Sequence, residues 1–272
     1  MRNILPPVIL WIASLAAGIA AATASENPLQ QGWDNLDGFL FNEAHTSFSR
    51  ATGFSGSAER ERKLGEAVTL LNVQPRTGGN ISRATALLQE LADAKISDDT
   101  DTFARFFLAR TLEMHQAPAD LAKARAIYLD LLESRPGTPL AEYGASKIAL
   151  IDLYDNIPAT EFARRVGELE KLEPLLKTSQ GRREFHANIG IACAEQDGPP
   201  DIMLRHLLAA DKEGFTQWQT ESIVWVLIAD AAEKGGDKEL ARQYYQKFTG
   251  KYKRDNRYYT IQERLKRLTA DQ

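Results

Sequence analysis

The sequence predicts an all-α protein, and three observations lead to this fold class. Apolar residues recur three and four positions apart over most of the chain, which is the spacing of one helix face. Pro and Gly separate these stretches, and both residue types end helices or form turns. No stretch alternates apolar and polar residues for long enough to predict a strand. We therefore expect about eleven helices joined by mostly short turns.

The composition is that of a soluble protein with a substantial core. The chain has 272 residues, of which 43% are hydrophobic and 26% charged. Its formal net charge of −4 gives no reason to expect nucleic acid as a partner. The single Cys excludes an intrachain disulfide.

The first element is a predicted signal peptide at residues 1–24. Arg2 provides a positive start, residues 4–22 carry no charge, and Ala22-Thr23-Ala24 forms a cleavage pattern. No Cys lies near the end of the apolar run, which excludes a bacterial lipoprotein anchor. An uncleaved membrane anchor is the alternative, although many Ala and Gly residues weaken insertion. In both cases we expect an exported chain, and one thiol favours a bacterial periplasm.

The mature chain is expected to begin with a polar segment at residues 25–57, which contains one short helix from about Phe39 to Phe48. A helical domain at residues 58–272 follows. Asn80 is a candidate N-cap, and the acids Asp98, Asp99 and Asp101 suit the start of a helix. Helices are expected at 58–73, 80–91, three times between 103 and 154, and at 158–177, 183–196, 202–212, 223–232, 237–252 and 258–268.

Four of these helices can be superposed by hand, because each presents three apolar or small residues at similar spacing. The four sets are Ala84, Leu88 and Leu91; Ala124, Tyr128 and Leu131; Met203, Leu207 and Ala210; and Ala241, Tyr245 and Phe248. The preceding helices share a pair of one large and one small residue. These pairs are Leu64-Gly65, Leu108-Ala109, Ile189-Gly190 and Ile228-Ala229. The recurrence predicts stacked helix pairs.

This pattern resembles the tetratricopeptide repeat (TPR), a unit of two helices with small and aromatic residues at fixed positions. The resemblance covers roughly residues 58–268 and implies a right-handed α-solenoid of antiparallel helix hairpins. The spacing between successive sets is 38 to 40 residues, counting the interval from Ala124 to Met203 as two units, and the TPR has 34. A related helical-hairpin solenoid is therefore the alternative.

The TPR resemblance also implies a function, namely binding of a protein or peptide partner in a groove formed by the first helices. By the resemblance, Phe106, Arg110, Glu113 and Asp230 are candidate groove residues. The alternative for Phe106 is a place in the core. We expect an exported adaptor in the cell envelope with no catalysis of its own, no cofactor and no metal.

The alternative of a different class is a hydrolase or lyase that acts on cell-wall or glycan material. Such an enzyme needs two carboxylates at a fixed separation, which the sequence alone does not place. The four His lack the spacing of a zinc protease, and no phosphate-binding loop or serine-hydrolase motif occurs. His186 and Cys193 are expected to be structural, with Cys193 in the core.

Residues 242–268, here called the basic aromatic segment, contain nine Lys or Arg but only the acids Asp255 and Glu263. Tyr and Phe residues lie between the basic ones. We expect this segment to be a terminal hairpin whose outer face is solvated. The alternative, in an exported protein, is a surface for an anionic membrane or an acidic partner.

Overall fold

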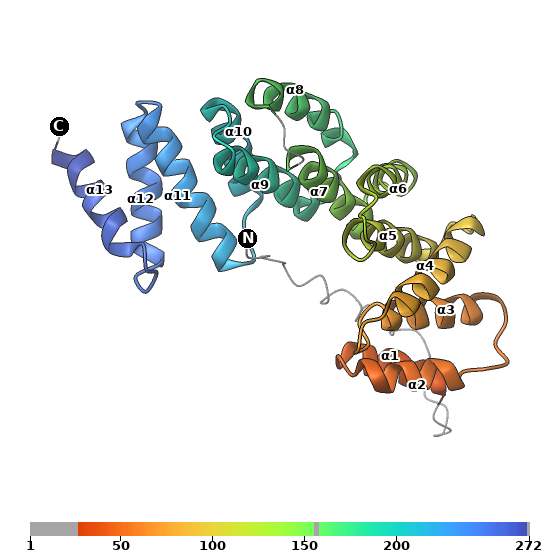
Figure 1. Cartoon of the computed structure of the whole chain (residues 1–272). Helices are drawn as coiled ribbons and strands as arrows, with labels where there is room; N and C mark the ends of the chain where they lie inside the picture. Colours follow the sequence, from red (N-terminus) through yellow and green to blue (C-terminus); the bar gives the residue numbers. More distant parts are fainter. Residues whose placement is uncertain (1–26, 155–157, 271–272) are drawn as a thin grey trace. The chain divides into compact units, whose positions relative to one another are not determined.

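The computed structural model describes residues 27–154 and 158–270 (Figure 1), and the predicted signal peptide lies outside them. Within these ranges the chain forms thirteen α-helices, one short 3₁₀ helix and no strand, so the all-α prediction is confirmed. No helix in the described ranges combines the length and apolar character needed to cross a bilayer.

The chain divides into two compact units, residues 1–124 and 125–272, which are described separately below. The first contains α1 (Pro28–Asp37), α2 (Phe41–Arg50), α3 (Gly56–Leu70), α4 (Gly78–Asp93) and α5 (Asp99–Met114). Helix α6 (Leu121–Ser134) crosses the division. The second contains α7 (Pro139–Leu153), α8 (Ala159–Glu170), η2 (Glu173–Leu175), α9 (Ser179–Glu195), α10 (Pro200–Glu213), α11 (Trp218–Lys234), α12 (Lys238–Lys251) and α13 (Tyr258–Ala270).

Helix α1 corrects the prediction of a polar segment before the first short helix. Pro28 occupies the first turn and the Asn27 side chain accepts a hydrogen bond from the backbone amide of Leu29. Leu29, Gly32 and Leu36 are buried, and they form the apolar stripe that the many Gln and Asn residues obscured in the sequence.

In the first unit consecutive helices pack against one another from α1 to α5. The start of α4 differs from the prediction, because Thr77 rather than Asn80 is the N-cap and its hydroxyl accepts from the Asn80 amide. The predicted role of the acids before α5 is confirmed, because the Asp98 side chain accepts from the Asp101 amide at 2.8 Å.

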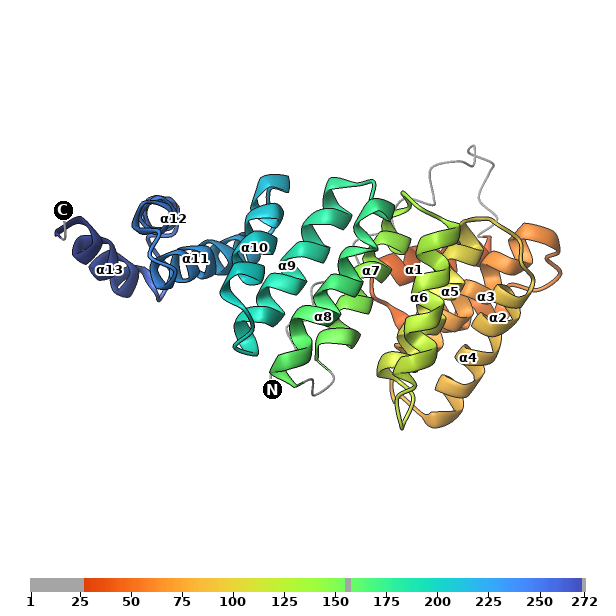
Figure 2. The ribbon, with the colours of Figure 1, turned by 90° about the horizontal axis from the view of Figure 1, so that it is seen from above.

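In the second unit α9 packs against α10, α10 against α11, α11 against α12, and α12 against α13. Figures 1 and 2 show α9 and α10 side by side in both views. Helix α7 packs mainly against α9, and α8 makes a smaller contact with α7. The predicted apolar stripe of α8 is buried at Phe162, Val166 and Leu169.

A buried carboxylate joins α7 to the start of α9. Glu142 is fully buried, and its oxygens accept from the backbone amides of Lys177 and Thr178, at 2.6 Å and 3.0 Å, and from the Thr178 hydroxyl. The Thr178 hydroxyl in turn accepts from the Gly181 amide and caps α9. An unpaired carboxylate at this depth would be costly, so these donors stabilise both the charge and the junction.

The superposition of the four second helices is consistent with burial. All twelve residues of the superposed sets are buried: Ala84, Leu88, Leu91, Ala124, Tyr128, Leu131, Met203, Leu207, Ala210, Ala241, Tyr245 and Phe248. The small residues of the large-and-small pairs are all buried, and the two glycines lie at close approaches. A Cβ added at Gly190 in α9 would come within 2.5 Å of the Leu207 side chain in α10, and Ala229 in α11 is fully buried.

Candidate functional site

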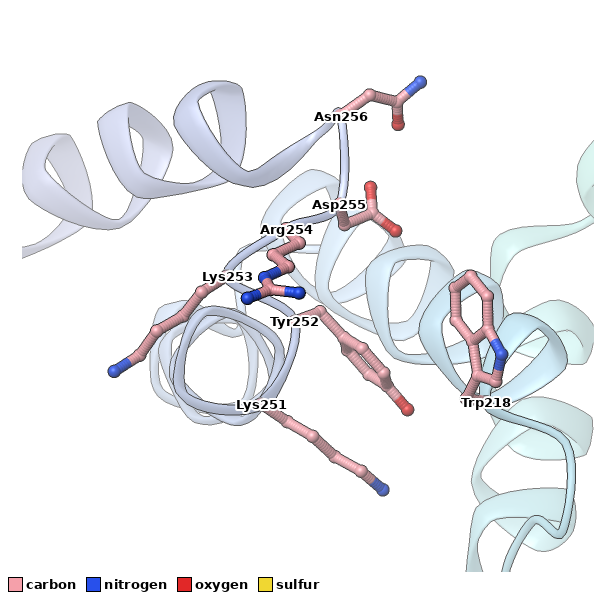
Figure 3. Close-up of a pocket in the computed structure, with 7 residues that line it drawn as sticks. All are labelled: Trp218, Lys251, Tyr252, Lys253, Arg254, Asp255 and Asn256. Atoms are coloured by element: carbon pink, nitrogen blue, oxygen red, sulfur yellow. The ribbon is translucent and has the colours of Figure 1, made fainter.

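A cleft in the second unit is the best candidate for a binding site. It lies between the start of α11 and the turn from α12 to α13, and its volume is about 720 Å³. Figure 3 shows Trp218 on one side and residues 251–256 on the other. The lining residues are Trp218, Lys251, Tyr252, Lys253, Arg254, Asp255 and Asn256.

The apolar part of the cleft is formed by two aromatic rings. Trp218 begins α11 and is 58% exposed, whereas Tyr252, which follows α12, is almost fully buried. Their ring centroids are 6.4 Å apart, and the Tyr252 ring also contacts Trp225 and Phe248 at 5.6 Å and 5.5 Å. The buried rings therefore support an indole that is open to solvent on one face.

Glu221 fixes the inner edge of this site. Its carboxylate accepts from the Tyr252 hydroxyl and from the Lys251 ammonium. Burial, and then the hydrogen bond to Glu221, raise the pKa of Tyr252, so the phenol stays protonated. The Lys251 ammonium, although exposed, is therefore paired with an acid of the protein itself.

The turn that forms the outer edge is held rigidly. The Arg257 guanidinium donates to both oxygens of Asp255, at 2.9 Å and 2.7 Å, and to the Ser222 hydroxyl of α11 at 2.8 Å. The hydrogen bonds from Arg257 lower the pKa of Asp255. Asp255, the one carboxyl group in the lining, is thus already paired, and the cleft does not present two facing acids.

The residues behind the cleft meet at one carboxylate. Asp211 of α10 accepts from the Trp225 indole at 2.6 Å, from the Tyr244 hydroxyl at 2.7 Å and from the Lys247 ammonium at 3.2 Å. Because these donors come from α11 and α12, Asp211 ties three helices together beneath the aromatic rings.

The structure places the four predicted groove residues as follows. Phe106 is fully buried, which fits the alternative of a place in the core. Arg110 and Glu113 are half-buried on α5. Asp230 of α11 accepts from the Tyr245 hydroxyl of α12 at 2.6 Å and from Arg264 of α13. Its carboxylate therefore links three helices.

Sequence reasoning named part of the cleft and missed the rest. Tyr252 and the basic residues lie in the basic aromatic segment. Trp218 was missed because the helix was expected to begin at Ile223, whereas α11 begins at Trp218 itself. The acid Glu221, three residues later in the first turn, was an available signal for the true helix start.

A second cluster of titratable groups lies between α9 and α10. His186 and His206 are buried, and their Nδ1 atoms are 2.9 Å apart. His206 Nε2 lies 3.2 Å from Glu170, which also binds Arg205, and His186 Nε2 lies 3.5 Å from Glu173. One Nδ1–H must donate to the unprotonated Nδ1 of the other ring, because two protonated Nδ1 atoms cannot face each other at this distance.

This cluster does not form a metal site of the usual kind. Among the described residues no group of three or more His, Cys, Asp and Glu side chains is arranged to hold a metal ion. Cys193 lies elsewhere in α9, fully buried, and its thiol donates to the Pro199 carbonyl oxygen at 3.2 Å. Burial raises the pKa of the Cys193 thiol to about 11.

Comparisons of the chain with protein-family models, with curated proteins and with solved structures find no match.

Proposed function

We propose that this protein is an exported, TPR-like adaptor that binds a protein or peptide partner in the cell envelope, with the periplasm as its place of action. The proposal includes a right-handed solenoid of antiparallel helix hairpins, as the TPR resemblance implies. Within each unit most helices pack against the next helix in the chain, which supports a repeat architecture. The predicted signal peptide supports export.

The observation that carries the binding proposal is the exposed Trp218 above a rigid, basic turn. A large indole left open to solvent, beside cationic side chains, is typical of protein-binding surfaces, where Trp and Arg contribute much of the affinity. The cleft volume of about 720 Å³ is within the range of ligand pockets. Its single, paired carboxyl group supports recognition rather than glycoside hydrolysis.

The test is capture from envelope extract followed by reconstitution. The purified mature chain, immobilised through a C-terminal tag, is expected to retain a specific protein, and that protein, once purified, is expected to bind with a measurable Kd. Trp218→Ala is expected to raise this Kd at least tenfold. The melting temperature is expected to stay unchanged, because the side chain is mostly exposed.

The same measurement compares the cleft with the groove that the TPR resemblance implies. Arg110→Ala, at a half-buried position of α5, is expected to raise the Kd if the partner binds in the groove. The free energy of unfolding is expected to change by less than about 0.5 kcal/mol. If no purified partner binds the wild-type chain, or if neither variant affects a partner that does bind, the adaptor proposal at these surfaces fails.

A further inference from the structure

The charges of the basic aromatic segment are not all neutralised within the protein. Six of its nine basic side chains lie within ion-pair distance of an acid: Arg242, Lys247, Lys251, Arg257, Arg264 and Lys266. Lys253, Arg254 and Arg267 are exposed and make no ion pair with any residue in the described part of the chain. Two of these three, Lys253 and Arg254, are adjacent and line the cleft.

The unpaired charges are presented by a turn that is already ordered. The Asp255 amide donates to the Tyr252 carbonyl oxygen, and the Tyr258 amide donates to the Asp255 carbonyl oxygen, both at 3.0 Å. With Arg257 clamped on Asp255 and Ser222, the backbone of Lys253 and Arg254 needs little further ordering when a ligand arrives. Preorganisation of this kind lowers the entropic cost of binding.

The charged and apolar parts of the site are spread over its width. Figure 3 shows Lys253 extending away from Trp218, with Tyr252 between them. A small anion at Lys253 would not reach the indole, whereas an extended chain can contact both. The ligand must therefore offer negative charge and an apolar group at separate points.

From this arrangement we propose that the cleft binds an acidic peptide segment, in which carboxylates meet Lys253 and Arg254 and one apolar side chain packs against Trp218. This inference rests on the proposed adaptor function and names the chemistry of its partner. The Arg254 guanidinium can hold a carboxylate by two parallel hydrogen bonds, and the indole excludes water from the contact.

An anionic membrane is the other occupant that a basic aromatic surface could suit. The concave form of the site favours the peptide, because a recess of about 720 Å³ receives a protruding side chain. The turn also presents the Asn256 amide beside the cations, and an amide suits a peptide backbone better than a lipid layer.

The test uses the mature chain and a fluorescein-labelled peptide with Glu-Glu-Phe-Glu-Glu at its centre, followed by fluorescence anisotropy. Arg254→Glu is expected to raise the Kd at least about tenfold, because charged hydrogen bonds are lost and the new carboxylate repels those of the peptide. Arg267→Glu is the matched control, because Arg267 is also exposed and unpaired in the described structure but does not line the cleft. It is expected to change the Kd less than about twofold, through long-range charge alone.

Four further probes define the ligand. Replacement of Phe by Gly in the peptide, or Trp218→Ala in the protein, is expected to cost at least about fivefold, because each removes one side of the same apolar contact. A peptide with Lys in place of Glu is expected not to bind. Vesicles of equal phosphatidylglycerol and phosphatidylcholine are expected to leave the protein in the supernatant after sedimentation.

Three results overturn the inference. One is that Arg254→Glu and Arg267→Glu weaken peptide binding equally. Another is that the protein binds the vesicles and does not bind the peptide. The third is a purified natural partner whose Kd is unaffected by Arg254→Glu and Trp218→Ala but raised by Arg110→Ala. That last result removes the acidic-peptide site and leaves the adaptor function standing.

Discussion

Gly190 lies at a close approach between α9 and α10. An added Cβ would lie 2.5 Å from Leu207 Cδ2 and 3.3 Å from the Leu207 backbone nitrogen. Leu207 is fully buried and cannot move aside. Gly190→Ala is therefore expected to lower the free energy of unfolding by about 1 to 3 kcal/mol, measured by urea denaturation.

The matched control for Gly190 is Gly167 in α8, where an added Cβ would meet nothing within 4 Å. Gly167→Ala is expected to raise the free energy of unfolding by about 0.4 to 1 kcal/mol, because Ala loses less conformational entropy in a helix. Equal effects at the two positions would contradict the close approach of α9 and α10.

Cys193 is expected to be unreactive while the protein is folded. Its side chain is fully buried and its thiol pKa is raised to about 11, so little thiolate forms at pH 8. A chromogenic disulfide reagent should label it only after denaturant is added. In a Thr260→Cys variant the exposed second thiol should react at once, and rapid labelling of two thiols in the native variant would place Cys193 at the surface.

The contact between the elements α9 and α10 is expected to weaken in mild acid. Burial lowers the pKa of His186, and burial together with the charge of His186 lowers the pKa of His206 to about 4. Because an unfolded His titrates near pH 6.5, the unfolded chain binds more protons between about pH 6.5 and 4. The stabilisation by the neutral rings is therefore complete above about pH 6.5 and falls as the pH drops through this range.

The measurement is the free energy of unfolding at several pH values in that range. The charges of Glu170, Glu173, Arg205 and Glu213 also act on the pair, so the wild-type curve must be compared with a variant. The wild type is expected to lose free energy of unfolding between about pH 6.5 and 4. His206→Gln is expected to reduce this loss by about 3 kcal/mol at most. Identical curves for the wild type and His206→Gln would contradict the role of the pair.

At the scale of elements, the sequence was sufficient to predict a helix wherever an apolar stripe and a helix terminator occurred together. The buried positions of the superposed second helices follow directly from such stripes. Helix α1 was missed because only Leu29 and Leu36 mark its face, and the small Gly32 completes it against the Phe48 ring. Small residues at close approaches carry no hydrophobic signal, so a period that depends on them is hidden.

The candidate site was harder to predict than the fold. The segment around Tyr252 could be recognised from its composition, but the distinction between paired and unpaired cations depends on acids far away in the chain. Lys251 is paired with Glu221, thirty residues earlier, whereas Arg254 is exposed. Spatial pairing of this kind cannot be deduced from local spacing, which is why the two unpaired cations of the cleft were not predicted.

At the scale of the whole molecule, the first question is where the mature chain begins. N-terminal sequencing of the protein from a periplasmic extract is expected to start at Ser25, because Ala22-Thr23-Ala24 fits the requirement of the signal peptidase. An intact N-terminus recovered in the membrane fraction would instead support the uncleaved anchor.

The junction made by Glu142 has a consequence for how this chain can vary. Glu142 in the first turn of α7 holds residues 177 and 178 at the start of α9, and the Gln196 side chain after α9 donates to the Leu153 carbonyl oxygen at the end of α7. The two helices therefore run side by side in the same direction, and the connection through α8 returns from the end of α7 to its start. These contacts do not involve α8 itself. An insertion after the exposed Lys171, at the end of α8, therefore adds a loop-closure cost that grows only with the logarithm of its length. A tag or reporter domain placed there should leave the α7–α9 contact in register.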